Sequence, residues 1–149
     1  MYKRQYLDTG AFEVVLTHNR YTLLDRSAED LFTRAHAAGI GVLNAAPYGG
    51  GMLAKGPGEQ AKYAYGERDD RIAEAARRMA EACADAGVPL AAAALQLSIR
   101  AGFIDSTVVG VSRPERVAET IEAASLDIPD GLWAELDRLT PPRSTWLDA

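Results

Sequence analysis

The stretch Gly39–Pro57, GIGVLNAAPYGGGMLAKGP, constrains the fold of this chain more than any other. Residues 42–46, VLNAA, make a short, mostly apolar run, which predicts a parallel strand covered on both faces. Pro47 ends this strand, and the glycines at 49–51 let the backbone take positive φ and approach another molecule closely. An isolated run of glycines is most often a flexible turn. Its position directly after a parallel strand, where α/β proteins bind ligands, favours a binding loop.

The rest of the chain alternates strands with helices. The β-branched segments FEVVLT at 12–17 and STVVGV at 106–111 are predicted strands, the second of them buried. Helical spacing of apolar residues recurs between them and after them. A helix is predicted from about Asp69 to Ala86, with an apolar stripe formed by Ile72, Ala75, Ala76, Met79, Ala80 and Cys83. Ser112, Pro114 and Glu115 stand in the preferred order of cap, proline and acid, and the helix that they open carries Val117, Ile121 and Ala124. This order is typical of repeated βα units with parallel strands and right-handed crossovers. No linker divides residues 1–149, so we expect a single domain.

The number of predicted strands is small for the length of the chain. A free-standing flavodoxin-like sheet in 149 residues would have five strands, whereas only three are predicted. Three parallel strands leave two edges with unpaired backbone groups, which soluble proteins normally protect. We therefore expect part of a larger closed α/β assembly, and self-association of the chain through its open edges.

Charge and composition exclude several classes of partner. The net charge of −5 and the isoelectric point near 5.0 argue against nucleic acid or an anionic membrane surface as the main partner. No apolar run approaches the ~20 residues of a membrane helix, and the first residues lead into no signal-peptide core. Cys83 is the only cysteine, which fits a reducing compartment, so we expect a cytoplasmic protein. No Cys/His cluster has metal-ligand spacing, and we predict no metal site.

Three motifs together resemble a known family. NRYTLLDR, GIGVLNAAPYGGGMLAKGP and STVVGVSRPERVAETIEAA occur in the order seen in the C-terminal part of the aldo/keto reductases. The resemblance is strongest to the sugar dehydrogenases that act on L-fucose, D-arabinose or L-galactose, and it covers essentially the whole chain. It implies an α/β fold that forms the C-terminal three βα units of a (β/α)8 TIM barrel, with strands at about 12–17, 42–46 and 106–111. Residues 1–149 are then a partial aldo/keto reductase domain.

The resemblance also implies where the chemistry lies. In the family, hydride passes between a nicotinamide and a carbonyl or hemiacetal carbon, with a Tyr as general acid/base tuned by a Lys, an Asp and a His. That tetrad belongs to the N-terminal half of the barrel, and no residue here matches it. Because a proton donor must lie within about 3 Å of the reacting oxygen, we expect no catalytic residue in this chain and no activity of the chain alone.

The resemblance implies that this chain binds NAD or NADP. His18 stands where the family commonly has a Gln that hydrogen-bonds the nicotinamide carboxamide, and Ala45 stands where it has an aromatic that stacks on the ring. The loop that wraps the pyrophosphate matches Tyr48, Gly49, Gly50, Gly51, Met52 and Leu53. The adenosine-phosphate site matches Ser112, Arg113, Arg116, Glu119 and Thr120. Free backbone N–H groups in such a loop, and a helix N-terminus, are both suited to anions.

Two departures from the family favour NAD over NADP. Gly110 replaces a Lys, and Thr120 an Asn, that are common in NADPH-preferring members. The function implied is oxidation of an aldose sugar to its lactone. Simpler interpretations stay open: His18 fills space at a barrel mouth, Arg113 and Arg116 lie on a solvated helix face, or the chain is a non-catalytic α/β module that binds a nucleotide phosphate or a partner's sheet edge.

Overall fold

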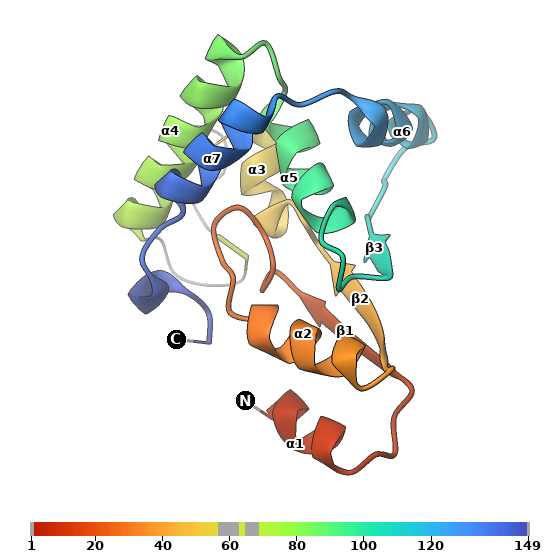
Figure 1. Cartoon of the computed structure of the whole chain (residues 1–149). Coiled ribbons are helices and arrows are strands. Elements are labelled where there is room, and N and C mark those ends of the chain that lie inside the picture. The colour runs from red at the N-terminus through yellow and green to blue at the C-terminus, as the bar shows by residue number, and fades with distance from the viewer. Residues whose placement is uncertain (1, 57–62, 65–68, 149) are drawn as a thin grey trace.

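The computed structural model describes residues 2–56, 63–64 and 69–148. Three strands, β1 (Val14–His18), β2 (Gly41–Ala45) and β3 (Ser106–Val108), form a parallel sheet in the order β1-β2-β3 (Figure 1). The α-helices are α1 (Tyr2–Asp8), α2 (Glu29–Ala37), α3 (Met52–Lys55), α4 (Asp70–Asp85), α5 (Leu90–Ile99), α6 (Glu115–Ser125) and α7 (Asp130–Leu139). Two short 3₁₀ helices, η1 (Gly49–Gly51) and η2 (Arg143–Thr145), complete the described elements.

The predicted α/β class and the parallel order of the strands are confirmed. β1 and β2 begin and end one or two residues away from their predicted bounds. β3 begins at Ser106 as predicted, but it has three paired residues where six were predicted. Its pairing with β2 ends at Val108, whose carbonyl accepts a hydrogen bond from the Ala46 amide at 3.2 Å. From there the chain leaves the sheet toward α6.

Helices cover one face of the sheet. Val15 and Thr17 of β1 and Val42 and Asn44 of β2 are buried on that face, where α2 packs on β2 and α5 on β3. Asn44 is held there by its Nδ2, which donates to the Tyr21 carbonyl and to the Ser98 hydroxyl, both at 2.9 Å. The alternation of side chains along each strand sends the neighbouring residues to the opposite face.

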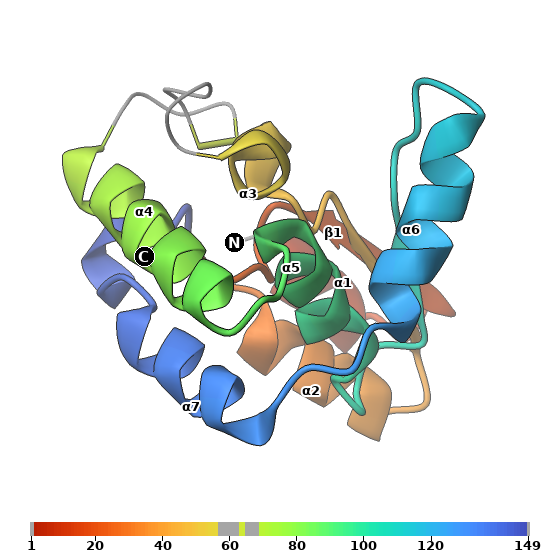
Figure 2. The same ribbon diagram turned by 90° about the horizontal axis from the view of Figure 1, so that it is seen from above.

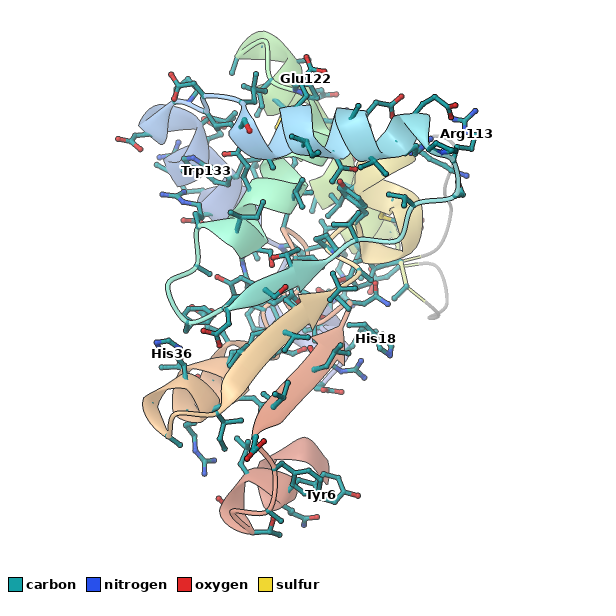
Figure 3. The ribbon with its side chains drawn as sticks, turned by 90° about the vertical axis from the view of Figure 1, so that its right-hand side faces the viewer. Tyr6, His18, His36, Arg113, Glu122 and Trp133 are labelled. Carbon is teal, nitrogen blue, oxygen red and sulfur yellow. The ribbon has the colours of Figure 1, made fainter. Side chains whose placement is uncertain are left out.

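That opposite face is open, which corrects the prediction for the second and third strands. Val14 of β1 is 53% exposed and Val108 of β3 is 41% exposed, while Leu43 and Ala45 of β2 are half-buried. Figure 3 shows the strands in front of α2 and α5, with this face toward the viewer. A mostly apolar strand is suited to cover on both sides, but its sequence does not say whether the same chain supplies the second layer.

The helices on the covered side form the core. The predicted stripe of α4 is confirmed except at Ala80, which is half-buried. Met79 and Cys83 are buried where α4 packs on α7 and α5, and burial raises the pKa of the Cys83 thiol to about 11. Ala92, Ala93 and Ala94 of α5 are buried, and the small side chains of this helix allow α3 and α6 to approach closely. No single described helix is long and apolar enough to cross a membrane, and α4 and α5 meet that condition only as a pair bent by 100°.

Helix α6 lies at the edge of the fold (Figure 2). It packs along α5, where Gln96 Nε2 donates to the Ala123 and Leu126 carbonyls at 2.8 and 2.6 Å. Figure 2 shows it beside α5 at the edge of the fold. Its apolar residues Val117 and Ile121 are 47% and 63% exposed, so α6 presents an uncovered apolar side as the sheet does.

The C-terminal segment is tied to the loop that follows β1 by a buried carboxylate. Asp25 is fully buried, and its Oδ1 accepts from the Ser27 amide at 2.8 Å and from the Ser27 hydroxyl at 2.6 Å. Its Oδ2 accepts from the Leu147 amide at 2.7 Å. Arg20 adds a bidentate contact with Asp148, at 2.7 and 3.2 Å.

We expect Asp25→Ala to lower the free energy of unfolding by about 3 kcal/mol, because it leaves three partly buried donors, the Ser27 amide and hydroxyl and the Leu147 amide, without this acceptor. The C-terminal segment should also become more sensitive to proteolysis. Urea denaturation and limited trypsin digestion measure the two effects. Asp127→Ala, at an exposed position, is the control and should behave like the wild type; an Asp25→Ala protein that unfolds as the control does would show that the carboxylate does not hold this segment.

Candidate functional site

A cleft of about 510 Å³ opens between the glycine loop with α3 and the first turns of α6. Figure 2 shows α3 above α5 and α6 to the right of α5, and Ala91 of α5 contributes to the lining of the cleft. The lining residues are Ala46, Tyr48, Gly50, Gly51, Ala54, Lys55, Ala91, Val109, Gly110, Val111, Arg116, Glu119, Thr120 and Ala123. Two motifs that are far apart in the sequence therefore line one cavity.

The glycine loop has a backbone that other residues rarely adopt. Gly49, Gly50 and Gly51 have φ values of 58°, 70° and 104°, so all three lie in the region that favours glycine. The loop turns back on Tyr48, whose carbonyl accepts from the amides of Gly51 at 3.0 Å and Leu53 at 3.1 Å. Met52 then starts α3. The three glycines are therefore required by the shape of the loop, and the positive φ expected for them is confirmed.

Tyr48 links this loop to α6. Its side chain is half-buried, and burial raises the pKa of its phenol, while the positive charge of Arg116 and the Thr120 hydroxyl act in the opposite direction. The phenol is therefore protonated at neutral pH and can donate a hydrogen bond within the cleft. Thr120 is oriented by its own hydroxyl, which donates to the Arg116 carbonyl at 2.6 Å.

The charges of the cleft are suited to a ligand that carries both phosphate and hydroxyl groups. Lys55 at the end of α3 and Arg116 on α6 are exposed cations in its lining, and Glu119 is an exposed carboxylate between Arg116 and Thr120 on the same helix. Arginine and lysine bind phosphate oxygens, and a carboxylate accepts hydrogen bonds from sugar hydroxyls. Lys55 was not among the predicted site residues. Its nearness to the glycine loop was the only signal in the sequence.

The other predicted site residues lie outside the lining of the cleft. Gly49, Met52 and Leu53 are buried. Ser112 and Arg113 are exposed and lie outside the lining. Helix α6 has Pro114 at its N-cap and no side-chain cap, so the expected cap by Ser112 is wrong. Figure 3 shows Arg113 beside the first turn of α6.

His18 lies apart from this cleft. It is the last residue of β1, pairs in register with Ala45 and is exposed on the open face of the sheet (Figure 3). Its Nδ1 is 3.2 Å from Nδ2 of Asn19, so the Asn19 amide donates to the ring when Nδ1 is unprotonated. Within the described ranges no group of three His, Cys, Asp or Glu side chains could hold a metal ion.

Comparison with known proteins identifies relatives that match most of this chain. Residues 3–141 match the model of the aldo/keto reductase family. The chain is 35% identical over 126 residues to D-threo-aldose 1-dehydrogenase from a Pseudomonas species, covering 83% of this chain and 38% of that protein. It is 31% identical over 134 residues to pyridoxal 4-dehydrogenase from Microbacterium luteolum, covering 89% and 39%. It is 26% identical over 143 residues to L-galactose dehydrogenase from Arabidopsis thaliana, covering 92% and 44%.

Solved structures of low sequence identity share the fold. The aldo-keto reductase AKR11C1 from Bacillus halodurans, in its apo form, superposes with a TM-score of 0.73 at 19% identity, over 97% of this chain and 48% of that one. Its holo form gives a TM-score of 0.72 at 18% identity, with the same coverage. The chain thus spans less than half of the length of each of these relatives. The family match over residues 3–141 shows that this chain belongs to the aldo/keto reductase family.

Proposed function

We propose that this chain is the cofactor-binding part of an NAD(P)-dependent oxidoreductase, with the dinucleotide bound in the cleft between the glycine loop and α6. The observation that carries the proposal is the meeting of the two predicted motifs in one cavity: Tyr48, Gly50 and Gly51 on one side, Arg116, Glu119 and Thr120 on the other. A volume of about 510 Å³ lies within the usual range of roughly 300–1,000 Å³ for ligand pockets.

The residues of the cleft suggest how a dinucleotide would lie. The pyrophosphate would lie against the glycine loop, close to Lys55, and the adenosine phosphate end against the first turns of α6, close to Arg116. His18, at the end of β1, would reach the nicotinamide carboxamide. Ser112 and Arg113, which border α6 outside the cleft, would contact the adenosine end only if the ligand extends past the lining residues.

Glu119 supports a preference for NAD. Its carboxylate would accept hydrogen bonds from the ribose hydroxyls of NAD and repel the 2′-phosphate of NADP. Gly110 lines the same cleft and has no positively charged side chain that could bind the 2′-phosphate.

We expect Glu119→Gln to raise the affinity for NADP roughly fivefold to tenfold and to change the affinity for NAD much less, because the substitution removes a like charge at an exposed site. Calorimetric titration at low salt measures both constants. Glu122→Gln is the matched control, since Glu122 is exposed on the same helix but outside the lining. An equal change in both variants would show that Glu119 does not face the 2′-position.

We further propose that β1, β2 and β3 with their helices are the last three βα units of a (β/α)8 barrel. The parallel order, and the open apolar face carrying Val14 and Val108, support this, because the interior face of a barrel strand needs neighbours from the other strands. His18 at the carboxyl end of β1 would then lie at the barrel mouth, where such enzymes place their active sites.

The proposed reaction is oxidation of an aldose such as L-fucose, D-arabinose or L-galactose to its lactone. The names of two relatives, an aldose dehydrogenase and a galactose dehydrogenase, support this substrate class. When bound, the nicotinamide would accept the hydride from the sugar carbon. We propose that the acid/base tetrad of the family lies outside these 149 residues, which hold the cofactor and do not themselves move the proton.

The test is titration of the purified chain with NAD and with NADP, followed by an assay of sugar oxidation. We expect saturable binding of NAD and no turnover of L-fucose. Failure of both dinucleotides to bind would reject the proposed site. Turnover at an enzyme-like rate would reject the assignment of catalysis to residues elsewhere.

A further inference from the structure

Tyr63 is a buried residue that the glycine-loop motif does not include, and it joins two loops of the candidate site. It is 3% exposed, and its hydroxyl donates to the Asn19 carbonyl at 2.7 Å. The same oxygen is 2.9 Å from the Thr22 hydroxyl. A phenol has one proton, which goes to Asn19, so Thr22 must be the donor in the second bond.

The resulting chain of hydrogen bonds has one direction. The Leu24 amide donates to the Thr22 hydroxyl at 3.1 Å, Thr22 donates to Tyr63, and Tyr63 donates to Asn19. The hydroxyls of Thr22 and Tyr63 are each both a donor and an acceptor. Hydrogen bonds that follow one another in this way strengthen each other in a buried setting. Burial also raises the pKa of Tyr63 far above that of free tyrosine, so the hydroxyl keeps its proton. The tyrosine is thus firmly attached to the loop that follows β1.

The ring and the next residue are attached to the glycine loop. A Cβ at Gly49 would lie 2.5 Å from Cε2 and 3.0 Å from Cδ2 of Tyr63. The Ala64 amide donates to the Gly49 carbonyl at 3.2 Å, and a Cβ at Gly50 would lie 2.9 Å from Cα of Ala64. Residues 63 and 64 therefore pack directly on the two glycines whose backbone shapes the loop.

We propose that Tyr63 is a positioning residue that holds the glycine loop in its binding shape by fixing it to the loop after β1. The inference rests on the proposed function for its consequence, because the loop it fixes is the one that would wrap the pyrophosphate. Tyr63 lies outside the cleft lining and acts through Gly49 and Gly50. A loop held in its bound conformation loses less entropy when the ligand binds.

Hydrogen exchange of the free protein tests this without any ligand. The amides of Gly51 and Leu53 report on the loop, because both donate to the Tyr48 carbonyl. We expect Tyr63→Phe to speed their exchange about tenfold, because the hydrogen bonds of the Tyr63 hydroxyl to Asn19 and to Thr22 are both lost. We also expect it to weaken NAD binding by a similar factor.

The control is Leu136→Ala, a core substitution on α7 that lowers global stability outside the site. Exchange is compared where both variants are fully folded. Equal acceleration in both variants, or none in Tyr63→Phe, would overturn the proposal. If Tyr63→Phe does not fold, Thr22→Val takes its place, because it removes the donor to Tyr63. We expect it to speed exchange by a smaller factor and only at the Gly51 and Leu53 amides. Unchanged exchange of these amides in Thr22→Val would also overturn the proposal. Absence of NAD binding to the wild type would reject the proposed function, while the exchange result would still decide the role of Tyr63.

Discussion

Alanine at position 49 will lower the free energy of unfolding by about 2–5 kcal/mol, the sum of a left-handed backbone cost and an overpacking cost. Gly49 has a φ of 58°, and its missing Cβ would lie 2.5 Å from the ring of Tyr63. The ring is held by its hydroxyl and cannot move aside without breaking the bond to Asn19. We expect the folded Gly49→Ala protein to bind NAD about tenfold more weakly, because the loop must regain its binding shape when the ligand binds.

Gly10→Ala separates the two causes. Gly10 has a similar φ of 62°, but no atom lies within 4 Å of its Cβ position. That variant should lose only about 1 kcal/mol, the backbone cost alone, and should bind NAD as the wild type does. Chemical denaturation and calorimetric titration measure both variants. Equal losses at the two glycines would mean that contact with Tyr63 contributes nothing.

The second prediction with a large expected effect concerns self-association through the open face of the sheet. The chain has an accessible surface of 8403 Å², whereas a compact monomer of its mass, 16.0 kDa, is expected to expose about 7,400 Å². The excess of about 1,000 Å² is comparable to the roughly 800 Å² that one partner contributes to a stable interface. Val14, Val108 and the exposed side of α6 are part of this surface.

We therefore expect the purified chain to be larger than a monomer at micromolar concentration. A double variant, Val14→Glu with Val108→Glu, should return it to the monomer mass, because two carboxylates on the face oppose close packing of a second apolar layer. Ile99→Glu is the control: Ile99 is 47% exposed but lies at the end of α5 and not on the sheet. Analytical ultracentrifugation gives the masses. A wild-type monomer that melts cooperatively would contradict the expectation.

Local signals in the sequence were sufficient for most of the elements and for the shape of the glycine loop. Proline at 47 ends the strand, and the glycines at 49–51 permit the positive φ values that the loop adopts, so its shape could be predicted without knowledge of its neighbours. The same holds for the apolar stripe of α4, whose spacing alone shows which residues are buried.

What depends on contacts between distant segments could not be predicted. Lys55 enters the cleft only because α3 lies opposite α6, and Tyr63 reaches Gly49 only because the chain folds back onto the loop. The sequences of β2 and β3 also do not show that one face of the sheet is open. An apolar strand has the same pattern whether its second face is covered by the same chain or by other βα units. Ser112 was expected to cap α6 by its position, but the helix begins after Pro114 instead.

The most direct measurement of the central claim is a two-dimensional NMR titration of the uniformly ¹⁵N-labelled chain with NAD. The cleft should bind the dinucleotide through both of its walls at once, so the amides of Gly50 and Gly51 and those of Arg116 and Thr120 should shift together and saturate with one dissociation constant. Shifts limited to other regions, such as the groove between α4 and α7, or no saturable shifts at all, would contradict the account.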